Sequence, residues 1–211
     1  AFNFPVWGML EKLAPALLAG LPTIVKPATP TAYIAAHAVR IIAESGALPL
    51  GAVQLIIGRV PGVLDRLGGQ DHIGFTGSAD TAARLRSDPA VPRRSTRFNA
   101  EADSLNCSVL GPDAVPGRPE FDLFADALVT EMTVKAGQKC TAIRRILVPK
   151  DKAGEGADHL AEALNAIKVG HPASGEVKMG PVATANQLTD VRKGVDTLAK
   201  GTKAGRGDGG R

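Results

Sequence analysis

Cys140 combines a nucleophilic side chain with a sequence neighbourhood that favours exposure. It lies in the stretch 137–141 (GQKCT), whose glycine and polar residues are typical of a loop that presents a thiol to substrate. Four nearby basic residues add positive charge, which favours the thiolate: Lys135, Lys139, Arg144 and Arg145. The competing interpretation is a small buried side chain, because free cysteines are among the most buried residues. Cys107 fits that competing interpretation, since it lies inside a predicted apolar strand.

Glu101 and Asp103 are the acidic residues of most interest, because they fall where the sequence pattern changes. A carboxylate at a junction between domains can act as a general base. The alternative is a solvated loop acid. The four histidines are scattered without metal-ligand spacing, and no Gly-x-Ser-x-Gly motif occurs. We therefore expect no metal site and no serine nucleophile.

Lys26 and Ser78 each follow a predicted strand. Ligands of open parallel sheets bind beyond the carboxyl ends of the strands, where Lys and Ser suit phosphate or ribose groups. The alternative is ordinary turn chemistry, because neither a Gly-x-Gly-x-x-Gly nor a P-loop motif is present. Asn3 has a similar ambiguity: its amide could donate to an oxyanion, but an Asn close to Pro5 also fits a turn.

The elements that would position these residues alternate between strand and helix. We predict strands over 23–25, 53–57 and 73–75, each followed by a helical segment, with Thr29 as a helix cap and Pro30 at the first helical position. Continuous apolar strands between helices predict a parallel sheet covered on both faces, with right-handed crossovers. The fold class is therefore α/β.

Apolar residues at helical spacing predict two buried helix faces. The first face comprises Ile34, Ala38, Ile41 and Ile42. The second, on a helix opened by Pro119, comprises Phe121, Phe124, Leu128, Val129 and Met132.

Beyond Asn99 the pattern changes, and we place a domain boundary near residues 101–105. Strands are predicted over 105–110 and 144–149, with a further helix that includes Leu160, Leu164 and Ile167.

The composition is that of a folded protein, with 44% hydrophobic and 22% charged residues among 211. No apolar run reaches the roughly 20 residues of a membrane-spanning helix. The net charge of +4 is spread over scattered basic residues, which favours solvated surface, then a phosphate-bearing ligand. Nucleic acid is not expected as a partner, because no aromatic platform accompanies the basic residues. Two cysteines are consistent with a reducing cytoplasm.

Taken together, the chain resembles the aldehyde dehydrogenase superfamily. The resemblance rests on an ordered, correctly spaced series over essentially residues 1–200: Asn3-Phe4-Pro5, Val25-Lys26-Pro27-Ala28, Phe75-Thr76-Gly77-Ser78, Glu101, Gly137-Gln138-x-Cys140 and Gly180-Pro181. Residue by residue, three segments resemble the dehydrogenase half of the bifunctional PaaZ enzymes of phenylacetate degradation: 2–8 (FNFPVWG), 101–106 (EADSLN) and 135–145 (KAGQKCTAIRR). A related semialdehyde dehydrogenase of benzoyl-CoA breakdown is similar in the same places.

The resemblance implies a role for each catalytic candidate. Cys140 would attack the aldehyde carbonyl, giving a thiohemiacetal and then a thioester. The side chain of Asn3 and the backbone N–H of Cys140 would hold the oxyanion. Glu101 would activate water to release the acid, and its presence counts against a CoA-acylating enzyme.

The resemblance also implies a nicotinamide cofactor. Lys26 would hold the adenosine ribose and Ser78 a pyrophosphate oxygen, with Pro27 and Gly77 in the same two segments. NAD-preferring relatives commonly carry Glu at position 29, whereas this chain has the uncharged Thr29. We therefore expect NADP, with NAD as the second choice, and an aldehyde substrate that is a CoA-linked semialdehyde.

By the same resemblance we expect part of an NAD(P)-binding, Rossmann-like domain over residues 1–101 and part of the catalytic domain over 102–200. Residues 201–211, rich in Gly, Lys and Arg, are expected to be disordered or artefactual. Family members are more than twice as long and form oligomers, so we expect a fragment of a homo-oligomeric, cytoplasmic enzyme that is poorly active alone. Residues 102–104 (ADS) depart from the usual Leu-Gly-Gly, a change that the PaaZ-like group shares.

Two other functions compete with this interpretation. A cysteine-dependent acyl-transferring hydrolase would need Cys140 and an oxyanion donor, but it leaves Lys26 and Ser78 unexplained. A non-catalytic nucleotide- or CoA-binding module would predict that Cys140 has only a packing role.

Overall fold

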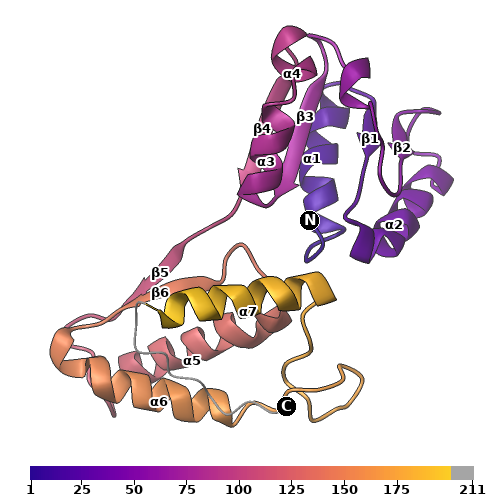
Figure 1. Ribbon diagram of the computed structural model, residues 1–211. Helices are drawn as coiled ribbons and strands as arrows, with labels where there is room; N and C mark the ends of the chain where they lie inside the picture. Colours follow the sequence, from indigo (N-terminus) through magenta and orange to yellow (C-terminus); the bar gives the residue numbers. More distant parts are fainter. Residues whose placement is uncertain (201–211) are drawn as a thin grey trace. The chain divides into compact units, whose positions relative to one another are not determined.

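The structure is a computed structural model that describes residues 1–200. The expectation of disorder over 201–211 therefore lies outside the described residues. The chain divides into two compact units, the first Ala1–Asp103 and the second from Ser104 onward. Figure 1 shows that each unit contains both strands and helices. The class is α/β, as predicted, and every strand pair in both units is parallel.

The first unit alternates helices and short strands. In chain order it contains α1 (Trp7–Leu18), β1 (Thr23–Val25), η1 (Thr29–Thr31), α2 (Ala32–Glu44), β2 (Val53–Leu55), η2 (Leu64–Arg66), β3 (His72–Gly77), α3 (Ala79–Arg86), α4 (Ala90–Arg93) and β4 (Arg97–Ala102). β1 pairs with β2 over three positions, and β3 pairs with β4 over six.

Small side chains let α2 approach β1 and β2 closely. Ala35 is fully buried and forms a core cluster with Met9 of α1 and Val39. The buried positions Ala32, Ala35 and Val39 are three and four residues apart, which is one face of a helix. Ile41 was predicted on this face but is 55% exposed. It lies two residues after Val39, about 200° around the helix, and so projects from the other side.

The predicted cap at Thr29 is wrong. Thr29 begins the 3₁₀ turn η1, and α2 begins only at Ala32, where Thr31 makes no side-chain cap hydrogen bond. A proline at the start of a turn suits this geometry, because its missing N–H would be unpaired there in any case. A 3₁₀ turn is a frequent entry to an α-helix.

β4 was not predicted, although it carries Glu101. Its six residues alternate between exposed and half-buried, and its sequence, RFNAEA, has no apolar run. Only its pairing with another strand identifies a strand of this kind. Here Arg97 through Ala102 pair in register with His72 through Gly77. Glu101 therefore stands at the end of a strand and not in a loop.

The second unit has one strand pair and three longer helices. It contains β5 (Asn106–Val109), α5 (Pro119–Thr133), η3 (Val134–Gly137), β6 (Ile143–Leu147), η4 (Lys150–Lys152), α6 (Ala153–Asn165) and α7 (Ala185–Ala199). Leu110, Ala114 and Phe121 form its buried cluster. Phe121 and Leu128 are buried as predicted, whereas Met132 is 38% exposed and Ile167 lies beyond the end of α6.

α7 was not predicted, although the sequence carries a start signal for it. The hydroxyl of Thr184 accepts a hydrogen bond from the N–H of Gln187 (3.2 Å), and Thr-x-x-Gln is a capping-box pattern. Leu188, Val191 and Val195 follow at helical spacing, and all three are exposed.

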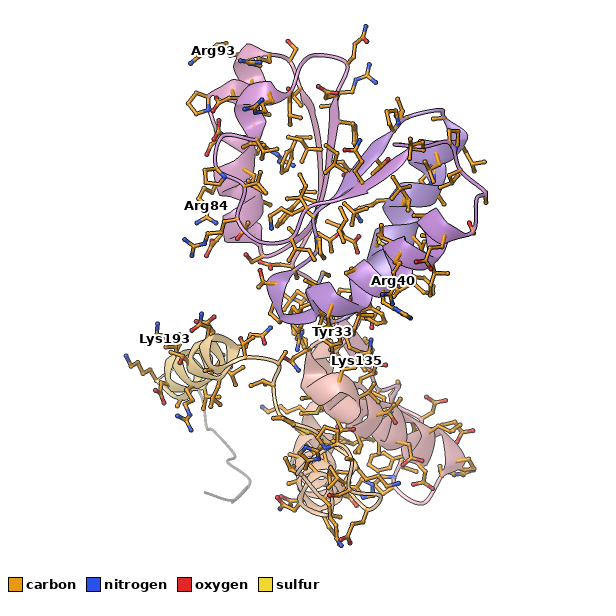
Figure 2. The ribbon with its side chains drawn as sticks, turned by 90° about the vertical axis from the view of Figure 1, so that its right-hand side faces the viewer. Tyr33, Arg40, Arg84, Arg93, Lys135 and Lys193 are labelled. Carbon is orange, nitrogen blue, oxygen red and sulfur yellow. The ribbon has the colours of Figure 1, made fainter. Side chains whose placement is uncertain are left out.

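Charged side chains lie on outer faces of both units, as the dispersed basic residues suggested. Figure 2 shows Arg84 and Arg93 projecting outward from α3 and α4, and Lys193 projecting from α7. Within residues 1–200, no helix has both the length and the apolar character needed to cross a membrane.

Candidate active site

Cys140 is exposed, so the alternative of a small buried side chain does not describe it. It follows η3, where α5 ends in three successive residues with left-handed backbone: Lys135 (φ 55°), Ala136 (φ 54°) and Gly137 (φ 68°). Such conformations are uncommon for residues other than glycine and cluster at functional sites. The turn redirects the chain from α5 into the segment that carries Cys140 and then into β6.

Side chains hold both peptide groups that flank Cys140. On the carboxyl side, the carbonyl oxygen of Cys140 accepts hydrogen bonds from the Ser104 hydroxyl and from Nδ2 of Asn106, the second at 2.6 Å. On the amino side, the carbonyl oxygen of Lys139 accepts one from Nη2 of Arg144 at 3.1 Å. Although Cys140 lies in a loop, its backbone is therefore anchored to the β5–β6 pair.

The charge around Cys140 differs from the predicted positive cluster. Nζ of Lys139 lies 2.8 Å from a carboxylate oxygen of Glu131, so its charge is largely balanced. Lys135 is exposed overall, but loss of water around its ammonium group lowers the pKa of Lys135. The Lys139 charge lowers that pKa further, and the Cys140 thiolate acts in the opposite direction. Lys135 thus interacts electrostatically with both Lys139 and Cys140.

Cys107 is exposed on β5, so its predicted burial is wrong. Apolar neighbours in the sequence do not bury a residue when its strand pairs on one side only. Among the described strands, β5 pairs with β6 alone. Exposure therefore does not distinguish the two cysteines. Cys140 differs because side chains hold the peptide groups on both sides of it.

Glu101 belongs to the first unit, on β4 directly opposite Thr76 of β3. Its carboxylate lies 3.5 Å from Nζ of Lys12 on α1, with half of the Glu101 side chain exposed (52%). No local pattern indicates this partner, because Lys12 is 89 residues away in the sequence. The carboxylate is both accessible to water and held near a cation.

Asp103 directly follows β4 and has a left-handed conformation (φ 54°). Its carboxylate accepts a hydrogen bond from the N–H of Ala79 at 3.2 Å, the first residue of α3. An acidic side chain at a helix start is electrostatically favourable. Asp103 therefore has a structural contact, and the solvated-loop alternative does not describe it.

Gly77 and Ser78 lie where β3 turns into α3. Ser78 caps the helix by accepting a hydrogen bond from the N–H of Thr81 at 3.4 Å. A Cβ at Gly77 would lie 2.6 Å from the ring of Phe75, so a side chain here would require that ring to move. The hydroxyl oxygen of Thr76 is buried and has no hydrogen-bond partner within residues 1–200.

The end of β1 places Lys26 and Thr29 in exposed positions around a buried Pro27. The nearby Thr31 hydroxyl donates to the carbonyl oxygen of Phe2 at 3.1 Å, which fixes the peptide that leads into Asn3. Asn3 is half-buried. Its segment is therefore tied to the turn that follows β1.

Within the first unit, the structure brings Gly77, Ser78 and Glu101 to the carboxyl end of the β3–β4 pair. Cys140 lies in the second unit, so its convergence with Asn3 and Glu101 stays a prediction. No group of three or more His, Cys, Asp or Glu side chains in the described residues could hold a metal ion.

Comparison with known proteins gives the family. Residues 1–209 match the aldehyde dehydrogenase family, and the chain belongs to it. This confirms the resemblance inferred from the ordered motifs.

Particular relatives refine this result. The chain is 52% identical over 198 residues to the 3,4-dehydroadipyl-CoA semialdehyde dehydrogenase of Aromatoleum evansii, covering 94% of this chain and 38% of that protein. This agrees with the resemblance of its motifs to those of the PaaZ enzymes.

Solved structures agree on the fold. The aldehyde dehydrogenase of Mycobacterium tuberculosis complexed with NAD⁺ is 26% identical, with a TM-score of 0.82 over 95% of this chain and 40% of that one. The glyceraldehyde-3-phosphate dehydrogenase GapN of Methanocaldococcus jannaschii, complexed with NADP, is 22% identical with a TM-score of 0.80, covering 95% of this chain and 43% of that one. The chain thus spans about two fifths of these relatives.

Proposed function

We propose that the whole protein oxidises a CoA-linked semialdehyde to the acid, with Cys140 as nucleophile and NADP as hydride acceptor. The observation that carries the proposal is the exposed thiol of Cys140, whose flanking peptide groups are both held by side chains. A cysteine with only a packing role would need neither feature. The 52% identity to a CoA-semialdehyde dehydrogenase supports the substrate class.

The residues of the first unit fit a dinucleotide. Lys26 and Ser78 are exposed at the ends of two parallel strands, where an ammonium group, a hydroxyl and the start of α3 suit ribose and phosphate. The unpartnered hydroxyl of Thr76 beside them is a buried polar atom that a bound ligand would satisfy. When bound there, the nicotinamide would supply the hydride acceptor.

The reaction then follows from the roles of the chain's own groups. The Cys140 thiolate forms a C–S bond to the aldehyde carbon, and the Asn3 amide and the Cys140 N–H bind the oxygen that becomes negative. Loss of hydride from that carbon leaves a thioester on Cys140. Glu101 takes a proton from water, which attacks the thioester, releases the acid and restores the thiolate.

The proposal is tested in the whole protein with NADP, using propanal and a CoA-linked semialdehyde as probes. Cys140→Ala should lower the rate of NADPH formation by more than about a thousandfold, because the covalent step is lost. Cys107→Ala, the matched control, should keep the rate within about twofold. Unchanged turnover in Cys140→Ala would refute the nucleophile.

Glu101→Gln separates the two halves of the reaction. It should give a burst of one NADPH per active subunit followed by slow turnover, because the thioester forms but water is no longer activated. The burst also separates the dehydrogenase from the acyl-transferring hydrolase, which would show no absorbance change at about 340 nm. Loss of the burst and the steady state together would contradict this role of Glu101.

A further inference from the structure

Arg144 fixes the peptide group that precedes Cys140. Its Nη2 donates to the Lys139 carbonyl oxygen at 3.1 Å, and the N–H of Ala142 donates to the same oxygen at 3.3 Å. The Lys139–Cys140 peptide is trans and therefore planar, so the N–H of Cys140 points away from that carbonyl. Whatever holds the carbonyl also sets the direction of this N–H.

Ser104 and Asn106 fix the peptide group that follows Cys140. Both side chains donate to the Cys140 carbonyl oxygen, and Nδ2 of Asn106 also lies 3.4 Å from the carbonyl oxygen of Ala142. With both peptide planes held, the backbone angles of Cys140 are restricted. The directions of its Cα–Cβ bond and of its N–H are set together.

We propose that Arg144, Ser104 and Asn106 are positioning residues that preorganise the N–H of Cys140 as an oxyanion donor. The inference rests on the proposed function. A hydrogen bond from a charged guanidinium is stronger than a neutral one, and it polarises the peptide so that its N–H is a better donor. A donor fixed before the reaction needs no reorganisation when charge develops on the substrate oxygen.

Arg144→Met in the whole protein tests this role. The change should lower kcat for propanal with NADP at least about tenfold and leave KM within about threefold, because the oxyanion forms only in the transition state. Arg144→Lys should restore part of kcat, since an ammonium group can still donate. Arg192→Met, on the exposed face of α7, is the matched control and should keep full activity.

Asn106→Asp tests the other peptide group with an isosteric side chain. An ionised carboxylate has no donor for the Cys140 carbonyl, so kcat should fall by a similar factor while the melting temperature changes by less than about 3 °C. Values of kcat within twofold of the wild type in both variants would overturn the inference. A loss of kcat that parallels the fall in melting temperature and is not restored in Arg144→Lys would also overturn it. An inactive wild type would instead refute the proposed function.

Discussion

At the scale of single residues, Glu101 combines an ion-pair partner with exposure to water. Its carboxylate faces Lys12 at 3.5 Å, yet both side chains retain access to water, at 52% and 31% exposure. An exposed ion pair of this kind contributes little to stability and can separate readily. The Glu101 carboxylate can therefore leave Lys12 and reach water.

Thr29 gives the prediction about cofactor choice. It is exposed on η1, and a glutamate there would place negative charge where a 2′-phosphate is proposed to bind. Thr29→Glu should lower the ratio of kcat/KM for NADP to that for NAD by at least about tenfold, through charge repulsion and new hydrogen bonds to the ribose. Steady-state kinetics of the whole protein would measure the ratio.

The uncharged variant Thr29→Gln separates charge from shape. It should leave the ratio within about threefold, because it adds the same volume without the carboxylate. An equal shift in both variants would mean that size, and not charge, sets the preference at this position.

Among the elements, η3 is the turn that connects α5 to the segment containing Cys140. Gly137 has φ of 68°, and a Cβ there would lie 3.2 Å from the carbonyl oxygen of Met132. Lys135 and Ala136 adopt the same left-handed region without being glycine. The turn thus depends on Gly137 for the one position where a side chain has no room.

Gly137→Ala should lower the free energy of unfolding by about 1–2 kcal/mol, because a left-handed alanine is strained and its methyl group meets backbone. Gly156→Ala, inside α6 with open space around its Cα, should raise it by about 0.5–1 kcal/mol. Urea unfolding of both variants measures the difference. Two changes of the same sign would contradict the proposed strain at η3.

At the scale of the whole molecule, the chain consists of two units with separate buried clusters. Large apolar side chains remain exposed in both, including Leu18 (90%), Trp7 (70%) and Leu198 (67%). Contacts with further protein would cover exposed apolar surface of this kind. The chain spans about two fifths of the relatives it matches.

We therefore expect the 211 residues alone to show less than about 1% of the NADP-dependent turnover of the whole protein, because they span only about two fifths of the relatives and catalysis depends on precise positioning. Parallel assays of both proteins, at equal concentrations of the Cys140 thiol, would measure the ratio. Equal turnover would show that the two units suffice.

The sequence by itself determined the family, the α/β class and the helices with clear apolar periodicity, because these depend on local spacing and on the order of short motifs. It left the burial of Cys140 open, because a loop nucleophile and a small buried side chain both fit the same local pattern. Only the tertiary structure decided the partners: Lys12 with Glu101, Asp103 with α3, and three side chains on the peptides around Cys140. Such contacts join residues up to 89 positions apart, and no local pattern encodes which distant side chain a fold will bring within hydrogen-bonding distance.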